Sequence, residues 1–324
     1  MSLPEWHNPR DEATSLLPDG YEARVLEPSL PTNLDPQWYA DDPTDPSGAT
    51  QTLVTPIPGE GVTWESMISE RPDLADYASD HWLGAYRRLE PLPAGYDTVR
   101  RALHQVVFFA IAPKRHLETG KLGLRYTHGG FGTPFFGADE QVRVDGEMIV
   151  HQQGDRVRVS VITTLRDAAD FLGIPYREAW FDGFHDPVEA VGPDAELQVG
   201  VGAAVAIGDW FGFAASVLEE ARRAPGADDV SRLQLWPEHF DPAFEMGSYE
   251  AGQRASYGAS PGDDSHPEPY LYVAAWGDID RTDPFWNDST FNGASLSYQE
   301  LLAANDQRAV ALDFMRSGWE RLTR

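Results

Sequence analysis

The chain of 324 residues contains no cysteine. This absence excludes disulfide scaffolds, thiolate zinc sites, iron–sulfur clusters and a cysteine nucleophile. Any metal site must therefore be built from nitrogen and oxygen ligands alone. A chain of this length buries roughly three quarters of its unfolded surface, so the fold needs no covalent cross-link.

Basic residues are scarce as well, and Lys114 and Lys121 are the only lysines. The 52 acidic residues against 25 basic ones give a formal net charge of −27. A surface of this charge repels nucleic acid and anionic lipid. We therefore expect no nucleic-acid partner and no membrane partner, and we look for a small-molecule ligand instead.

The sequence also lacks the pattern of a secretory signal and an apolar stretch of membrane-spanning length that is free of charge. The first twenty residues have no cationic segment followed by an apolar run, so we expect no secretory signal. The most apolar stretch, Val199 to Leu218, carries Asp209 near its centre. An ionised Asp at mid-bilayer costs about 2.5–3.5 kcal/mol, which favours a buried helix of a soluble protein. A cytoplasmic location is the expectation.

Residues 1–95 are rich in proline and acidic residues. Each proline removes a backbone donor and disfavours helix at the residue before it. We expect this region to be an arm that wraps the main body, held by aromatic anchors such as Trp6 and Trp38. Short helices are predicted near Trp64–Ser69 and Pro72–Arg88.

Residues 96–324 have the regular patterns of a folded core. Asp145-Gly146 between two alternating segments predicts a hairpin, and Thr163 or Thr164 together with Gly173 marks the ends of a helix. The grouping of strands and helices predicts an α+β fold with mostly antiparallel sheets and packed helices. Two diverged halves, about 96–225 and 226–324, are one interpretation, although no repeat period stands out. The predicted helices are Thr98–Ile111, Thr164–Leu172, Asp194–Arg223 with a break near Gly200 or Gly202, and Tyr298–Arg321. The predicted strands are Leu122–Tyr126, Gln141–Val144, Met148–His151, Arg156–Ile162, Arg232–Trp236, Arg254–Ala259 and Tyr270–Trp276.

Three glycine-rich motifs favour structure over chemistry. The segment 258–262 matches the G-x-S-x-G pattern, but Pro261 follows the serine and has no N–H to donate to an oxyanion. The segment 200–205 lacks the third glycine and the preceding strand of a dinucleotide fingerprint. The segment 128–134 has no phosphate-loop lysine and is interpreted as a tight connection or, less strongly, as a ligand-facing loop.

Two loops rich in histidine and acids carry the candidate site. His239 and Asp241 follow one predicted strand, and Asp263, His266 and Glu268 precede another. If these strands are neighbours, both loops lie at one edge of a sheet. A histidine beside carboxylates suits general acid–base catalysis. The same donors suit a divalent metal such as Zn²⁺, Fe²⁺ or Mn²⁺.

We therefore predict His239, Asp241, Asp263 and Glu268 as catalytic residues, and His239, Asp241, His266 and Glu268 as metal ligands. The alternative for the same residues is turn chemistry, because Asp, Ser and Pro commonly cap loops. Aromatic residues near both loops fill the core or line a small-molecule pocket.

Three segments, GLRYTHGGFGTPFF, LQLWPEHFD and YGASPGDDSHPEPYLYVAAW, resemble those of an uncharacterised, mostly actinobacterial family of cytoplasmic proteins. The resemblance covers Thr98 to Arg324, and a weaker one extends to another family of unknown function. It implies no activity, substrate or cofactor. It adds weight to His239, Asp241, Asp263 and Glu268, and less to His266, because they lie within these motifs.

The hypothesis from sequence is an enzyme that acts on a small molecule through this site, with or without a metal. The alternatives are a non-catalytic protein that binds a small ligand and an interaction protein whose proline-rich arm engages a partner.

Overall fold

The computed structural model describes residues 21, 23, 88–127, 130–137, 140–180, 188–224 and 226–324. Most of the predicted arm lies outside these residues, including Trp6, Trp38 and the two helices expected between Trp64 and Arg88.

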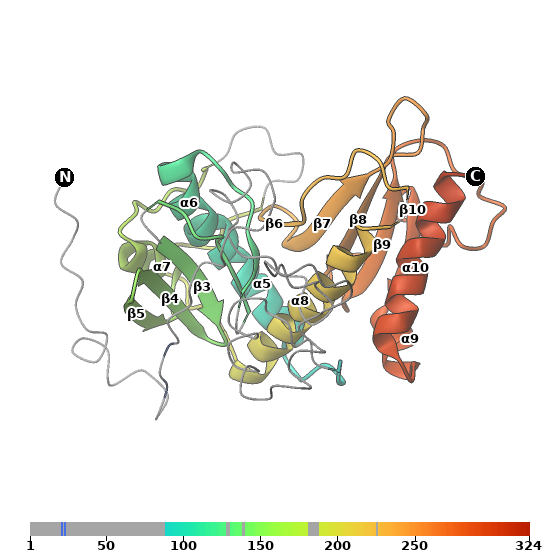
Figure 1. Cartoon of the computed structure of the whole chain (residues 1–324). Helices are drawn as coiled ribbons and strands as arrows, with labels where there is room; N and C mark the ends of the chain where they lie inside the picture. The colour runs from blue at the N-terminus through green and yellow to red at the C-terminus, as the bar shows by residue number, and fades with distance from the viewer. Residues whose placement is uncertain are drawn as a thin grey trace, which may run out of the picture.

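The described chain is α+β, as the sequence predicts, with two antiparallel five-stranded sheets and packed helices (Figure 1). The elements of the first part are α5 (Tyr96–Val106), η3 (Val107–Ile111), α6 (Ala112–Thr119), β1 (Arg125–Thr127), β2 (Gly130–Gly132), β3 (Glu140–Asp145), β4 (Met148–Gln153), β5 (Arg156–Val161), α7 (Leu165–Leu172) and α8 (Val201–Ala221). The second part contains β6 (Gln234–Trp236), β7 (Asp241–Met246), β8 (Ala255–Ser260), β9 (Tyr270–Ala275), β10 (Gly293–Ser297), α9 (Tyr298–Ala303) and α10 (Gln307–Leu322).

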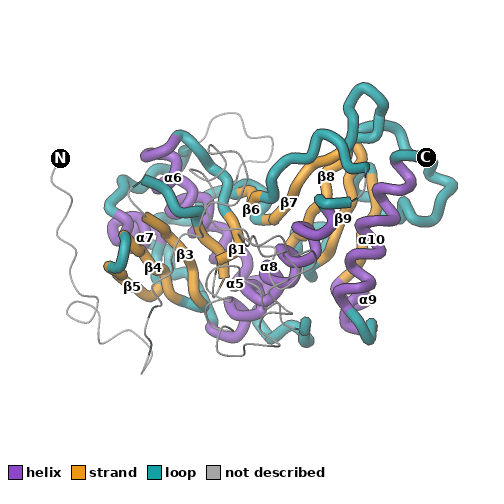
Figure 2. The backbone as a smooth tube through the Cα atoms, viewed as in Figure 1, coloured by secondary structure: helices purple, strands orange, loops and turns teal. Residues whose placement is uncertain are grey.

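Each sheet is a meander in which neighbouring strands are consecutive in sequence. The first sheet runs from β1 to β5 and the second from β6 to β10, so one sheet falls in each of the two predicted halves. The two sheets meet at Leu124 and Leu235, which exchange backbone hydrogen bonds of 2.8 Å in both directions. Figure 2 shows the sheets on opposite sides of the molecule with α5 and α8 between them.

Local signals set several element ends where the sequence predicts them. The Thr164 side chain accepts a hydrogen bond from the Asp167 N–H at the start of α7, and Gly173 ends that helix with φ of 69°. The hairpin at Asp145-Gly146 forms as β3 and β4. The helix predicted from Thr98 continues past Ile111, through a π-helical turn directly before Pro113. That turn reroutes the backbone hydrogen bonds where the proline ring would otherwise clash.

Other expectations differ from the structure. Gly130–Gly132 forms strand β2 rather than a loop, whereas His128 and Gly129 lie outside the described residues. The helix predicted over Tyr298–Arg321 is interrupted, because Ser297 and Asp306 each cap a separate helix. The long apolar helix starts at Val201, directly after Gly200, which is one of the two positions where a break is predicted, and the segment 194–200 before it is not helical.

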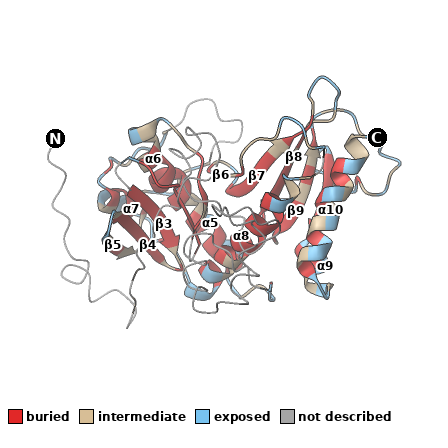
Figure 3. Cartoon of the chain, in the orientation of Figure 1, coloured by how far each residue is buried: buried red, intermediate tan, exposed pale blue. Residues whose placement is uncertain are grey.

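Helix α8 forms the centre of the core and packs against strands of both sheets and against α5 and α10. Trp210, Phe211 and Phe213 are completely buried on it, and Figure 3 shows α8 largely in the colour of buried residues. Among the described residues α8 is the one helix whose length and apolar composition would allow it to cross a membrane. Because 72% of its apolar window is buried inside the protein, that composition is explained by the core.

The two faces of the second sheet have different partners. Phe244, Tyr257 and Val273 share the core face, where Phe244 and Tyr257 stack with ring centroids 5.3 Å apart. Asp241 and Tyr272 occupy the opposite face, because side chains alternate along a strand. This opposite face forms one wall of the candidate site.

Tyr21 and Ala23 are the described residues of the arm that contact the first sheet. They pack against an apolar cluster on its outer face, formed by Met148, Val150 and Val159. The Tyr21 hydroxyl also donates a hydrogen bond of 3.1 Å to Asp145. At this point the chain before residue 96 is docked on the core.

Candidate functional site

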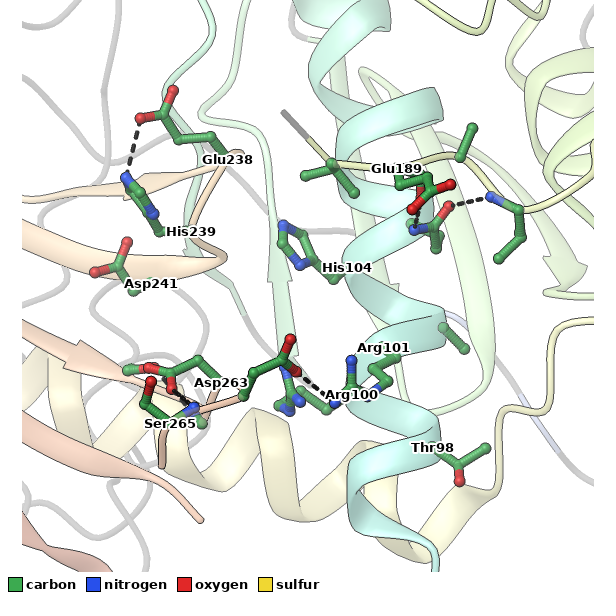
Figure 4. Close-up of a pocket in the computed structure, with 18 of the residues that line it drawn as sticks. Thr98, Arg100, Arg101, His104, Glu189, Glu238, His239, Asp241, Asp263 and Ser265 are labelled. Atoms are coloured by element: carbon green, nitrogen blue, oxygen red, sulfur yellow. Dashed lines mark hydrogen bonds and ion pairs between the residues drawn. The ribbon is translucent and has the colours of Figure 1, made fainter. Parts of the chain in front are cut away.

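A cavity of about 1460 Å³ lies between α5, the segment 188–198 and the outer face of the second sheet. Figure 4 shows His104, Arg100 and Arg101 on the α5 side, facing Glu238, His239, Asp241 and Asp263 on the sheet side. The walls therefore come from both parts of the chain. The predicted site residues that line this cavity are His239, Asp241 and Asp263.

The turn between β6 and β7 is held in an unusual conformation. Phe240 has φ of 56°, in the left-handed region that aromatic residues rarely adopt. Its buried ring stacks on the His104 ring, with the ring centroids 5.4 Å apart. It contacts the rings of Phe131 and Phe211 edge-on, at centroid distances of 5.0 and 5.1 Å. This packing sets the direction of the residues on either side. His239 is left half-exposed at the cavity, and Asp241 is turned inward.

His104 fixes the same turn from the side of α5. Its Nε2 donates a hydrogen bond of 2.9 Å to the carbonyl of Pro237. Burial lowers the pKa of His104 to about 4, although the Pro237 carbonyl opposes this shift. The ring is therefore neutral near pH 7 and acts as a donor to the turn rather than as a charge.

Asp241 is the buried acid of the site, with a residue exposure of 4%. The Tyr272 hydroxyl donates a hydrogen bond of 2.5 Å to its Oδ2. Its Oδ1 has no hydrogen-bond partner within the part of the chain that the structure describes. Burial raises the pKa of Asp241, and the nearby His239 and the bond from Tyr272 only partly oppose this. The carboxyl is thus protonated more readily than an exposed aspartate.

Tyr272 reaches Asp241 across an intervening strand. Asp241 is on β7 and Tyr272 is on β9. Gly258 on the intervening strand β8 pairs with Tyr272 on one side and, on the other, with Ala243, two positions from Asp241. A Cβ atom at Gly258 would lie 2.3 Å from the Tyr272 hydroxyl oxygen. The absence of a side chain at Gly258 therefore makes the Tyr272–Asp241 contact possible.

Asp263 organises the loop between β8 and β9. Its Oδ1 accepts hydrogen bonds from the backbone N–H groups of Ser265 and His266 at 2.7 and 2.8 Å. Its Oδ2 accepts a third, of 2.7 Å, from the Tyr270 hydroxyl. These contacts match the turn-capping alternative for Asp263. The residue shapes the cavity wall and anchors Tyr270.

His266 and Glu268 do not line the cavity. His266 Nε2 lies 3.2 Å from Asp288 Oδ2, while its Nδ1 is 3.7 Å from Asp263. Glu268 accepts hydrogen bonds of 3.0 and 3.1 Å from Gln299 on α9. The two side chains are therefore engaged by Asp288 and by Gln299, outside the cavity.

The predicted ligand set of His239, Asp241, His266 and Glu268 therefore does not converge. Throughout the described ranges, no three His, Asp or Glu side chains form a group that could hold a metal ion. The side chains of the four predicted ligands instead contact four different residues, which are Glu238, Tyr272, Asp288 and Gln299.

The residues that complete the site are not among those predicted as catalytic or metal-binding, although Tyr270 and Tyr272 belong to the aromatic residues expected in the core or along a pocket. Tyr270 and Tyr272 are two positions apart on one strand, and Gly258 and Ser260 have the same spacing on the next. This period-two pattern of tyrosines beside small residues was the available signal. Nothing in the local sequence points to His104, which comes from a helix 135 positions before His239.

The two rejected motifs behave as expected where they are described. Ser260 is the last residue of β8, and a loop rather than a helix follows it. Its hydroxyl accepts a hydrogen bond of 3.1 Å from the Gly262 N–H. The segment 200–205 lies at the start of α8, with Gly200 preceding the helix and no strand before it.

Comparisons with known proteins do not identify the chain, since no family model, curated protein or solved structure matches it. The geometry of this cavity is therefore the basis on which a function can be proposed.

Proposed function

We propose that the chain is an enzyme that acts on a small molecule in this cavity, with Asp241 as the general acid–base group. The observation that carries the proposal is the Asp241 carboxyl. It lines a large cavity, it is buried, and one of its two oxygens has no partner within the described residues. A buried acid left in this state is typical of a functional site rather than of a stabilising one.

The neighbouring residues supply the conditions for such a role. The Tyr272 hydroxyl holds one carboxyl oxygen in place, which leaves the other for a substrate hydroxyl or amine. Burial and the Asp241 charge keep the pKa of Tyr272 well above its usual value, so the phenol stays a donor. His239 is half-exposed, and its Nε2 lies 3.0 Å from Glu238 Oε1. An imidazole in this position is suited to pass protons between the cavity and solvent.

The metal-assisted form of the hypothesis has less support, because the donors do not group around one point. A cytoplasmic location and a small-molecule partner, without nucleic acid or membrane, remain parts of the proposal. The net charge of −27 supports the part that concerns nucleic acid and membrane, because both are anionic.

The test is conversion of an unidentified substrate. Purified protein is incubated with a small-molecule extract of the cells that produce it, and mass spectrometry follows which compounds disappear and which appear. Asp241→Asn keeps the size of the side chain but cannot donate or accept the proton. We expect its conversion rate to fall about a hundredfold or more, the range of general acid–base catalysis.

Asp278→Asn is the matched control, because Asp278 is exposed and lies outside the cavity. It is expected to convert the same compound at the wild-type rate. Undiminished conversion by Asp241→Asn, or no conversion by the wild type, would contradict the proposal. A compound that binds saturably in the cavity and is never altered would instead favour the non-catalytic binding protein.

A further inference from the structure

The charged groups of the cavity are strongly unbalanced. Its lining contains six acidic side chains and two basic ones. These are Glu189, Glu196, Glu238, Asp241, Asp263 and Asp264 against Arg100 and Arg101. A cleft lined by one sign of charge focuses the potential and concentrates ligands of the opposite sign.

Both arginines already have acidic partners. Arg101 Nε lies 3.0 Å from Asp97, and its terminal nitrogen lies 2.7 Å from Asp264. The buried Arg100 guanidinium lies 2.5 Å from Asp97, although its Nε has no hydrogen-bond partner. The cationic side of the cavity is therefore neutralised by the protein itself, which leaves little charge for an anionic ligand.

Part of the acidic side lacks cationic partners. Glu189 and Glu196 are exposed at the cavity and make no ion pair within the described ranges. Asp241 lines the same cavity and is more than nine-tenths buried, and its Oδ1 has no hydrogen-bond partner within the described residues. This buried oxygen does not depend on the acidic residues around it, and it can accept a hydrogen bond from a ligand.

The wall beside Asp241 is aromatic. Tyr270, Tyr272 and Phe291 line the cavity, with Tyr272 between the other two and ring centroids 6.1 Å apart in both contacts. Aromatic faces attract cations and cover the carbon skeleton that carries them. Carboxylate and aromatic groups together form the usual recognition set for a protonated nitrogen.

We propose that the cavity takes a small organic cation, a protonated amine on a short carbon skeleton, with its nitrogen bound at Asp241. The inference rests on the proposed function for the position of the site and adds the class of substrate. The ammonium donates to Oδ1, and the rings cover its carbon atoms. The positive charge of the bound ammonium would also compensate the burial of the Asp241 carboxylate.

The experiment compares a cationic amine, a neutral alcohol and an anionic carboxylate of similar shape, for each of two carbon skeletons. Isothermal titration measures binding of phenethylamine, phenethyl alcohol and phenylacetate, and of butylamine, butanol and butyrate. We expect at least one amine to bind saturably below about 10 mM and about tenfold more tightly than its alcohol. The carboxylates are expected not to bind. Amine affinity should fall as salt is added, because screening weakens the attraction.

Asp241→Asn should weaken amine binding about tenfold or more, and Glu196→Gln, an exposed position, should weaken it less. Asp278→Asn is the control for attraction by the acidic surface alone and should bind amines like the wild type. Circular dichroism establishes that each variant is folded. Tighter binding of a carboxylate or an alcohol, equal amine binding by Asp241→Asn, or no saturable amine binding would overturn the inference.

These results are distinguishable from a failure of the proposed function. Preference for a carboxylate would move recognition to Arg100 and leave general acid–base catalysis at Asp241 intact. Amine binding without conversion of any compound in the cell extract would keep the ligand class and remove the catalytic role.

Discussion

Replacing Gly258 with alanine tests the arrangement on which the candidate site depends. A Cβ atom at this position would lie 2.3 Å from both the Tyr272 hydroxyl oxygen and the ring carbon that carries it. Favourable contacts between carbon atoms begin at about 3.5 Å, so the tyrosine ring must move by about an ångström or more. The hydrogen bond of 2.5 Å to Asp241 cannot survive this displacement.

The expected loss of stability arises because the buried Asp241 carboxyl loses its hydrogen bond from Tyr272. A buried acceptor without its partner costs about 1–3 kcal/mol, and alanine in place of glycine returns about 0.4–1 kcal/mol through the unfolded state. The net change in the free energy of unfolding is therefore a loss of about 1–2 kcal/mol, measured by urea denaturation. The rate of substrate conversion should also fall in this variant.

Gly202→Ala is the matched control, because Gly202 is exposed on α8 with no atom within 4 Å of an added Cβ. This variant should be stabilised by about 0.5–1 kcal/mol. In a Tyr272→Ala background, Gly258→Ala should no longer destabilise, because the clashing ring is gone. An equal loss in both backgrounds would refute the proposed steric link between Gly258 and Tyr272.

Two further predictions concern a residue that sequence reasoning missed and one that it selected. In NMR titration of the folded protein, the His104 ring should stay neutral until the pH approaches 4. Because the unfolded ring takes up a proton near pH 6.5, the stability that His104 contributes is complete above pH 6.5 and declines as the pH falls towards 4. Titration of the folded-state ring near pH 6.5 would contradict this prediction. Glu268→Gln should leave substrate conversion and amine affinity at wild-type values, because Glu268 faces Gln299 outside the cavity; a tenfold loss in either assay would return Glu268 to the site.

The features of the fold that the sequence predicts are those encoded by a few adjacent residues. Asp145-Gly146 specifies its hairpin and Thr164 with Gly173 specifies the ends of α7, because turn and cap geometry are local. Strand β7 escaped prediction because Asp241 and Pro242 are poor strand formers. Pairing with β6 and β8 determines its conformation, and that pairing is not visible locally.

In the candidate site, too, some features are encoded locally in the sequence and others depend on the tertiary structure. Its position on the β6–β7 turn followed from the density of polar residues around His239 and Asp241. The selection among those residues depended on where each side chain points, which strand register and loop geometry decide. Asp263 and His266 are three positions apart, yet only Asp263 lines the cavity. Sequence spacing therefore located the region, while the tertiary structure separated Asp241 from its neighbours.

The conformation of Phe240 explains why the site requires both parts of the chain. A non-glycine residue in the left-handed region costs about 1–3 kcal/mol, and each aromatic contact returns about 0.5–1.5 kcal/mol. The rings that hold Phe240 come from His104, Phe131 and Phe211, all of which precede the second sheet. The turn that directs His239 to the cavity and Asp241 into it is thus stabilised by the first part of the chain. The functional unit is accordingly the core as a whole, because the second sheet alone would carry Asp241 without the contacts that orient it.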